Sequence, residues 1–426
     1  MMHASTLQAG VAQMDITPPL GIDLTGYVAR AGAANGVHDP LHAKALVFDN
    51  GTTSVALLTV DILGLQHATV QAVRTAIAAA TDIPADHVMI ACSHSHSGPA
   101  TMTLHGCGVV DAAYLAHLQT QLCAVAVEAW AARQPAHIGI GQGQVQEGVH
   151  NRRTAGDLID PALGILRVDD TKGNLLGVLL NYTCHPTCVT GENTLLSAEY
   201  CGLAAAQIQA ETGAVVLWTT GAIGDVGPVR RGWDVLTALG ETVRAEALRV
   251  LPTIATTLCT RLASATQPVL LPFSPLPSAE ELTIFLDAQQ AILADPEQLQ
   301  RPYQDRIAGA MIDWATATLA QVTAPNASTT VTTELQVLRI GDLALVSAPG
   351  ELFVELGLAI KAGAADGHCF VCGFGNDNIG YIPARRAYPH GGYEIADAYK
   401  YYGYPAVLAP EAGELLVATA LGLLKG

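Results

Sequence analysis

Residues 90–100 read Ile-Ala-Cys-Ser-His-Ser-His-Ser-Gly-Pro-Ala, and the rest of the chain can be understood from this stretch. The apolar run 88–92 predicts a short buried strand, and the breaker pair Gly98-Pro99 predicts a loop after it. Ligands and metals gather where strands end in α/β proteins, so His94 and His96 are candidate site residues. If strand-like alternation continues, the two rings point to opposite sides, and one binds a metal while the other acts from another direction. The alternative is a pair of polar loop histidines without a function.

Two later strands repeat this pattern. The run 176–181 continues into Tyr-Thr-Cys-His-Pro-Thr, which places His185 at a strand end, and the run 215–219 ends in a glycine-rich loop that contains Asp225. A single buried histidine is more often a core residue, but two strands that each end at a histidine favour a metal site. Glu351 follows Pro349-Gly350 and is expected at the start of a helix over 351–362, either as a cap or as a metal ligand.

Alternating strand and helix patterns extend along the whole chain. The dipeptide Asn50-Gly51 predicts a hairpin between strands at 43–49 and 55–63. Helical periodicity predicts helices at 66–80, 112–132, 233–250, 280–293, 303–319 and 409–424. The sequence contains no internal repeat and no linker that clearly divides it. The predicted fold class is therefore α/β (mixed α+β): a single large domain with mixed β-sheets flanked by helices and a metal site at strand ends.

The composition limits the possible functions. The chain has 426 residues and a formal net charge of −17, which argues against a nucleic-acid surface and against anionic membranes. No apolar run reaches about 18 residues, so no transmembrane segment is predicted. The first residues lack a secretory signal, so a cytoplasmic location and reduced thiols at the nine cysteines are expected. Cys369 and Cys372 have redox spacing but are interpreted as packing residues, whereas a role for Cys92, Cys184 and Cys188 beyond packing stays open.

Short motifs occur in the order in which they occur in a known enzyme family. They are Ile16-Thr17-Pro18, Val37-His38-Asp39-Pro40, the histidine motif 93–99, His185-Pro186-Thr187, Gly224-Asp225-Val226, Pro349-Gly350-Glu351 and Gly380-Tyr381. As an ordered set they resemble the catalytic, N-terminal domain of the neutral/alkaline non-lysosomal ceramidase family, across nearly the whole length of the chain. The resemblance implies a zinc-dependent hydrolase of lipid metabolism that cleaves the amide bond of ceramide or another N-acyl compound.

The resemblance also implies roles for individual residues. Zinc would be bound by His94, His185, Glu351 and Tyr381, and such a nitrogen and oxygen set with a water describes a catalytic zinc. His96 and Arg152 would face the substrate, His96 as a donor to the oxyanion and Arg152 as a clamp on a polar or anionic group. Asp225 would hold a ligand or its loop in place. Two alternatives stay open: Tyr381 could donate a hydrogen bond to the substrate, and the pair Arg152-Arg153 could belong to a solvated loop.

The chain departs from the family pattern at two points. Family members carry a serine that serves the reaction at the position of Gly227. They also continue into an immunoglobulin-like domain, whereas residues 1–426 are expected to form one ceramidase-like zinc hydrolase domain without it. Two alternatives therefore remain: a zinc hydrolase of an ester, lactone or glycoside in a small polar substrate, and a zinc-binding protein without catalysis. The expected partner is a small molecule, and a long apolar groove would favour a lipid whereas a polar pocket would oppose it.

Overall fold

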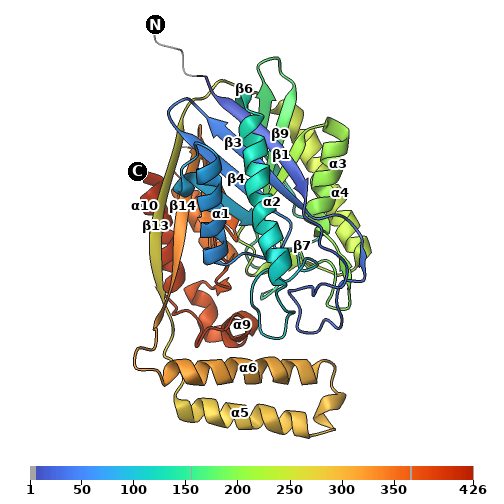
Figure 1. The fold of residues 1–426 in the computed structure, drawn as a ribbon, viewed down its shortest axis with the longest axis vertical. Coiled ribbons are helices and arrows are strands. Elements are labelled where there is room, and N and C mark those ends of the chain that lie inside the picture. Colours follow the sequence, from blue (N-terminus) through green and yellow to red (C-terminus); the bar gives the residue numbers. More distant parts are fainter. Residues whose placement is uncertain (1–5, 155, 365–366, 426) are drawn as a thin grey trace.

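The computed structural model describes residues 6–154, 156–364 and 367–425. An eight-stranded sheet forms its centre, with the strand order β11-β9-β8-β6-β1-β3-β4-β5 (Figure 1). The strands are β1 (Gln8–Asp15), β3 (His42–Asp49), β4 (Ser54–Val60), β5 (Val88–Cys92), β6 (Gln134–Gln144), β8 (Ala162–Asp170), β9 (Leu175–Tyr182) and β11 (Val215–Thr220). The pairs β4–β5 and β9–β11 are parallel, and the other neighbours are antiparallel. The sheet is therefore mixed, with a parallel pair at each edge.

A second, four-stranded sheet packs against one face of the first. It has the order β13-β14-β15-β17, with strands β13 (Leu262–Pro272), β14 (Thr330–Ile340), β15 (Leu343–Ala348) and β17 (His368–Gly373). Leucines of both sheets, among them Leu57 and Leu345, share one buried apolar cluster. The two sheets approach closely at Gly164, where an added Cβ would lie 2.4 Å from the ring of Phe370. A glycine is therefore required at this point of β8.

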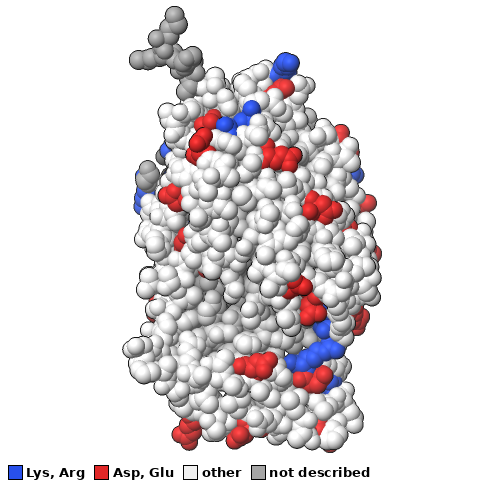
Figure 2. Space-filling view, viewed as in Figure 1, with Lys and Arg blue, Asp and Glu red and all other residues white. Residues whose placement is uncertain are grey.

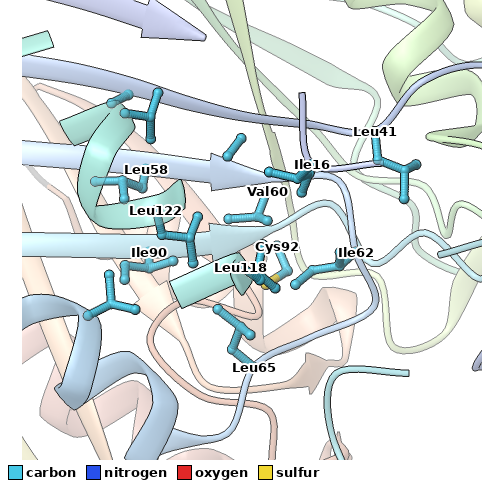
Figure 3. Packing of buried hydrophobic residues seen from close by; sticks show 14 of the residues in the cluster. Ile16, Leu41, Leu58, Val60, Ile62, Leu65, Ile90, Cys92, Leu118 and Leu122 are labelled. Carbon is cyan, nitrogen blue, oxygen red and sulfur yellow. The ribbon is translucent and has the colours of Figure 1, made fainter. Parts of the chain in front are cut away.

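Helices cover the outer faces of both sheets and complete four layers (Figure 1). The helices on the large sheet are α1 (His67–Ala80), α2 (Ala112–Ala131), α3 (Glu199–Thr212) and α4 (Trp233–Val250). The helices on the small sheet are α7 (Val354–Gly363) and α10 (Ala412–Lys425). Figure 3 shows part of the core under α2, where Leu118 and Leu122 meet Val60 and Ile90 of the strands. The fold class predicted from the sequence is confirmed.

Local sequence signals fix several of these elements. The Asn50 side-chain oxygen accepts hydrogen bonds from the backbone N–H groups of Thr52 and Thr53, and Gly51 has a positive φ of 84°, so the predicted hairpin between β3 and β4 forms. The side chain of Asp111 caps α2 by accepting from the backbone N–H of Tyr114 (2.8 Å). These contacts lie within a few residues of each other, which is why the sequence alone predicts them.

Two antiparallel helices stand apart from the sheets at the lower end of Figure 1. They are α5 (Ala279–Ala294) and α6 (Gln304–Val322), close to the predicted ranges. Ser278 and Glu281 form a capping box at the start of α5. Leu282 and Trp314 form a small apolar core between the helices, and this core also contacts Tyr399 of α9 (Ala398–Tyr401). The pair is thereby attached to the segment that carries the tyrosines of the site.

Short strands connect the layers around the strand ends. They are β2 (Gly36–Val37), β7 (Val149–Asn151), β10 (Leu195–Leu196), β12 (Val226–Pro228), β16 (Glu351–Leu352) and β18 (Tyr381–Ile382), and a one-turn helix, α8 (Tyr393–Ala396), follows. The prediction that Glu351 starts a helix is wrong, because Glu351 lies in β16 and α7 begins at Val354. The parallel pairing of β16 with β18 places Glu351 directly opposite Tyr381. This pairing was not visible in the sequence because it joins segments 30 residues apart in the sequence.

No helix in the described part of the chain is long and apolar enough to cross a membrane. The cytoplasmic location expected from the sequence stays a prediction. No disulfide joins the nine cysteines, all of which lie in described segments. Cys92, Cys184 and Cys188 are buried, and burial raises the pKa of each thiol above its ordinary value. These three thiols therefore stay protonated and pack beside the site.

Candidate metal centre

Three histidines meet where two strands of the large sheet, β5 and β9, end. His94 and His96 follow β5, and His185 follows β9. The Nε2 atoms of His94 and His96 are 3.1 Å apart, and those of His96 and His185 are 3.3 Å apart. The idea that the two rings of the first motif point to opposite sides is wrong, because β5 ends at Cys92 and His94 adopts a positive φ of 67°. The left-handed residue turns the chain so that both rings face one point.

Hydrogen bonds fix the orientation of all three rings. The Nδ1 atom of each ring lies near a backbone carbonyl: His94 near Leu63 (2.8 Å), His96 near Gly26 (3.0 Å) and His185 near Ile223 (3.3 Å). A carbonyl oxygen only accepts, so the protons of neutral His94 and His96 sit on Nδ1 and their Nε2 lone pairs point at each other. Nδ1 of His185 has a second neighbour, the donor Nη1 of Arg152, at 3.4 Å. Lone pairs at 3.1 Å repel unless a cation lies between them. The arrangement is the one expected of histidine ligands held by backbone acceptors.

Glu351 completes this group with an unpaired carboxylate oxygen. Its Oε2 lies 3.8 Å from Nε2 of His94 and 3.6 Å from Nε2 of His185, and it accepts no hydrogen bond from any described residue. Its Oε1 accepts from the hydroxyl of Tyr402 at 2.6 Å. Ligand atoms in a tetrahedral site with bonds of about 2.0–2.1 Å are about 3.3–3.4 Å apart. The distances of 3.6 and 3.8 Å from Glu351 are slightly longer than this, and together with the orphaned oxygen they fit a divalent transition metal held by His94, His185 and Glu351.

The electrostatics of the metal-free site also favour a cation. His94 and His185 are each 1% exposed and Glu351 is 2% exposed. Burial lowers the pKa of His94 to about 3 and holds the pKa values of His96 and His185 well below the usual value, so the rings are neutral near pH 7. Burial also raises the pKa of Glu351 to about 7, although Arg152 opposes this shift. A bound cation would relieve the cost of the buried carboxylate.

Arg152 and Tyr381 lie beside this group. Nη2 of Arg152 donates to the Tyr381 hydroxyl (2.7 Å) and to the carbonyl of Gly224 (2.7 Å), and its Nε lies 3.2 Å from a carboxylate oxygen of Glu394. Arg152 is therefore not part of a solvated loop. A guanidinium that donates to the phenol leaves an oxygen lone pair of Tyr381 free to face the histidines, which is compatible with the predicted ligand role. That role stays a prediction.

Asp225 is a buried positioning residue. One of its oxygens accepts from the backbone N–H of Val354 at the start of α7, and the other accepts from the side chain of Asn151. Its backbone carbonyl accepts from the N–H of Arg152 (2.8 Å). Asp225 thus ties the loop before β12, the segment of Arg152 and the helix after Glu351 together. These contacts are compatible with the expectation that Asp225 holds a ligand or its loop in place, and that role stays a prediction; Asp225 also lines the larger of the two cavities at the site.

Sequence reasoning missed three aromatic residues of the site. Phe374 stacks on His94 with ring centroids 3.8 Å apart and an angle of 7°, and Tyr402 binds Glu351. Tyr27 packs against His96 with centroids 4.9 Å apart. Phe374 gave no signal in the sequence, whereas Tyr27 follows Gly26 in a glycine-rich stretch and Tyr402 lies in a segment that contains several tyrosines. Gly26 is required there because an added Cβ would lie 2.5 Å from Nδ1 of His96.

Two cavities open at the histidine group. The larger has a volume of about 910 Å³ and is lined by charged side chains, among them Arg152, Arg153, Arg231, Arg386, Asp157 and Glu394. The smaller has about 160 Å³ and reaches Glu351, and its other walls include Val28, Leu63, Leu104 and Cys107. His96 lines both cavities, whereas His94 lines neither. The larger cavity combines these charged groups with apolar walls that include Phe353 and Tyr393.

The fold and the site together define a class: a four-layer α/β protein with a buried histidine and carboxylate group at its strand ends. The chain belongs to the neutral/alkaline non-lysosomal ceramidase family, because the model of the N-terminal region of that family matches residues 7–223. The family resemblance read from the motifs is thus confirmed, and the chain is a ceramidase-family hydrolase. Glu351 and Tyr381 lie beyond the matched segment.

Individual relatives agree with this membership. The chain is 23% identical to the neutral ceramidase of Pseudomonas aeruginosa over 463 residues, which span 90% of this chain and 68% of that protein. It is 24% identical to neutral ceramidase A of Dictyostelium discoideum over 223 residues, or 47% of this chain and 31% of that protein. The crystal structure of the Pseudomonas enzyme superimposes with a TM-score of 0.76 at 20% identity, covering 99% of this chain and 75% of that one. A ceramidase complexed with C2 superimposes with a TM-score of 0.75 at 18% identity, covering 98% of this chain and 75% of that one.

Proposed function

We propose that the protein is a zinc-dependent hydrolase that cleaves the amide bond of an N-acyl compound with a water molecule. The observation that carries the proposal is the convergence of three imidazole Nε2 atoms beside an unpaired buried carboxylate oxygen. We further propose that residues 1–426 act as one catalytic domain, since the candidate ligands come from both halves of the chain. An ester, lactone or glycoside is the alternative bond, and the charged side chains that line the larger cavity support keeping it.

We assign the metal-holding role to His94, His185, Glu351 and Tyr381. His96 is left to face the substrate, because it is the ring of the three that lines both cavities and is partly exposed. Zinc, when bound, supplies a Lewis acid and lowers the pKa of a bound water to about 7. The imidazoles are already neutral and oriented, so no rearrangement of these rings is needed for binding.

The remaining side chains have distinct tasks in amide hydrolysis. The Nε2 of neutral His96 is an acceptor, so this ring can take a proton from water and then return it to the departing amine. The predicted donor role of His96 toward the oxyanion therefore requires a second proton on the ring. The buried Nε–H of Arg152 lies 3.2 Å from Glu394 but does not point at it, so it can donate to a carbonyl oxygen as negative charge develops. Asp225 keeps Arg152 in place.

Metal content and turnover in matched variants test the proposal. The purified protein is expected to hold about one zinc ion and to lose hydrolysis of N-acyl substrates in chelator. His185→Ala should lose both zinc and turnover, whereas His96→Ala should keep zinc and lose about 100- to 1,000-fold in rate. His137→Ala, on β6 and away from the strand ends, is the matched control and should change neither. Full turnover in chelator, or zinc and normal turnover in His185→Ala, would overturn the proposal.

A further inference from the structure

The two cavities beside the histidines differ in size and in chemistry, and they share His96 and Tyr381 as lining residues. The smaller cavity, of about 160 Å³, contacts the site at Glu351 and Tyr381. A dry cavity of about 150 Å³ in a protein core holds one benzene molecule, so a hydrocarbon group confined to this cavity has about six carbon atoms. A fatty acyl chain of the length found in membrane lipids is far larger and would extend out of it.

Four arginines line the larger cavity of this acidic protein, beside three carboxylates. The chain carries 38 acidic and 21 basic residues, and on the face in Figure 2 acidic side chains are spread widely while basic ones gather at a few places. Three of the four arginines contact carboxylates: Arg152 and Arg153 share Glu394, and Arg386 contacts Asp157 and Glu355.

Arg231 is the exception among the four. It follows β12, and no carboxylate of the described residues lies within 4.0 Å of it. Its neighbour Arg230 is near Asp234 at 3.8 Å. Nη1 of Arg231 donates to the hydroxyl of Tyr27 (2.9 Å), and that hydroxyl donates in turn to the carbonyl of Val189 (2.9 Å). The Arg231 guanidinium is thus held at the cavity by a neutral partner and keeps its charge available.

Tyr27 also sets the distance from Arg231 to the reacting atoms. The Tyr27 ring packs against His96, and its hydroxyl at the other end binds Arg231. With standard bond lengths, the guanidinium lies no more than about 11 Å from the His96 ring. An anionic group several bonds from an amide nitrogen spans such a distance. A guanidinium is a planar, two-pronged donor that matches a carboxylate.

We infer that the substrate is a short-chain N-acyl ω-amino acid or a similar N-acyl carboxylate whose carboxylate lies several bonds from the amide nitrogen, with its acyl group of up to about six carbons in the smaller cavity and its carboxylate on Arg231. This inference rests on the proposed amide hydrolysis. Water adds its oxygen to the carbonyl carbon, the carbon–nitrogen bond breaks, and the amine leaves with a proton from the water. The products are a short fatty acid and a free amino acid, and ceramide is disfavoured because neither of its chains fits the small cavity.

A panel of six amides tests the inference. N-acetyl, N-hexanoyl and N-palmitoyl derivatives of 6-aminohexanoate are compared with the same derivatives of its uncharged carboxamide, and kcat/KM is measured for each. The hexanoyl carboxylate is expected to be best, with an advantage of about tenfold over its carboxamide that shrinks at high salt. In Arg231→Gln this ratio should fall to near one, whereas Arg230→Gln, the matched neighbour, should retain it. Leu104→Ala, which enlarges the smaller cavity, should move the optimum to longer acyl chains.

The outcomes separate this inference from the function on which it rests. Hydrolysis of none of the six amides by the zinc-loaded protein would overturn the proposed amidase itself. Hydrolysis of carboxamides and carboxylates at equal rates, or a palmitoyl optimum, would refute only the substrate class. A charge preference that persists in Arg231→Gln would refute the role of Arg231.

Discussion

Replacing Glu351 by glutamine should change stability in opposite directions with and without metal. Burial raises the pKa of Glu351 from 4.5 in the unfolded chain to about 7 in the metal-free folded protein. The folded protein therefore binds this proton more tightly, so the contribution of Glu351 to stability falls as the pH rises from about 4.5 to about 7. At about 1.4 kcal/mol per pKa unit, the ionised carboxylate costs about 3 kcal/mol above pH 7.

Glutamine carries no charge at any pH, so Glu351→Gln should avoid this cost. In chelator at about pH 8.5 the variant is expected to be more stable than the parent by about 1–3 kcal/mol, and the difference should shrink as the pH falls toward about 5. The lower value of this range applies if the buried amide group of the introduced glutamine, which replaces the unpaired oxygen, also lacks a hydrogen-bond partner. With zinc the order should reverse, because loss of a ligand is expected to weaken binding by about 100-fold or more. At saturating zinc this removes about 2.7 kcal/mol or more of stabilisation from the variant.

Urea unfolding at both pH values, in chelator and in zinc, measures these four differences. Glu334→Gln provides the matched control, since Glu334 is a buried carboxylate whose partner is Arg74. Breaking that ion pair should cost about 3–5 kcal/mol with or without metal. A metal-free Glu351→Gln variant that is less stable than the parent at about pH 8.5 would refute the reasoning. It would mean that the Glu351 carboxylate stabilises the fold through Arg152 and is not a strained metal ligand.

Three further measurements probe the site. Zinc affinity, measured by competition with a fluorescent chelator, should fall about tenfold per pH unit below about pH 7, because Glu351 must lose its proton to bind the metal whereas the pKa of His94 is about 3. The same slope of affinity against pH in Glu351→Gln would contradict this. Gly227→Ser should raise amide turnover and should change the free energy of unfolding by less than about 0.5 kcal/mol, since the nearest atom to an added Cβ is 3.6 Å away in His185. A large loss of stability would show that the space beside Gly227 does not accept a side chain. Phe374→Leu should keep the fold and weaken zinc binding about 10-fold, because the ring that orients His94 is lost; unchanged affinity would show that the stack is only packing.

Local features of the sequence predicted much of the fold. The helix predicted at 233–250 coincides with α4, and the one predicted at 112–132 differs from α2 by one residue. The hairpin at Asn50-Gly51 forms as expected. Each of these depends on periodicity, a cap or a turn within a few residues, and such signals need no knowledge of the rest of the chain. The prediction of a helix start at Glu351 was wrong for the opposite reason: the distant strand β18 pairs with Glu351, and the helix begins only at Val354.

The sequence by itself determined that His94, His96 and His185 lie at strand ends, because apolar runs that stop at a histidine and a proline encode this locally. Only the tertiary structure decided that the three Nε2 atoms lie close together, that Phe374 and Tyr402 support the site, and that no carboxylate of the described segments lies beside Arg231. Direction and pairing of side chains depend on which segments the sheets and loops bring together. Tyr402 and Glu351 are 51 residues apart, and Arg231 and Tyr27 are 204 apart, so no local pattern could have joined them.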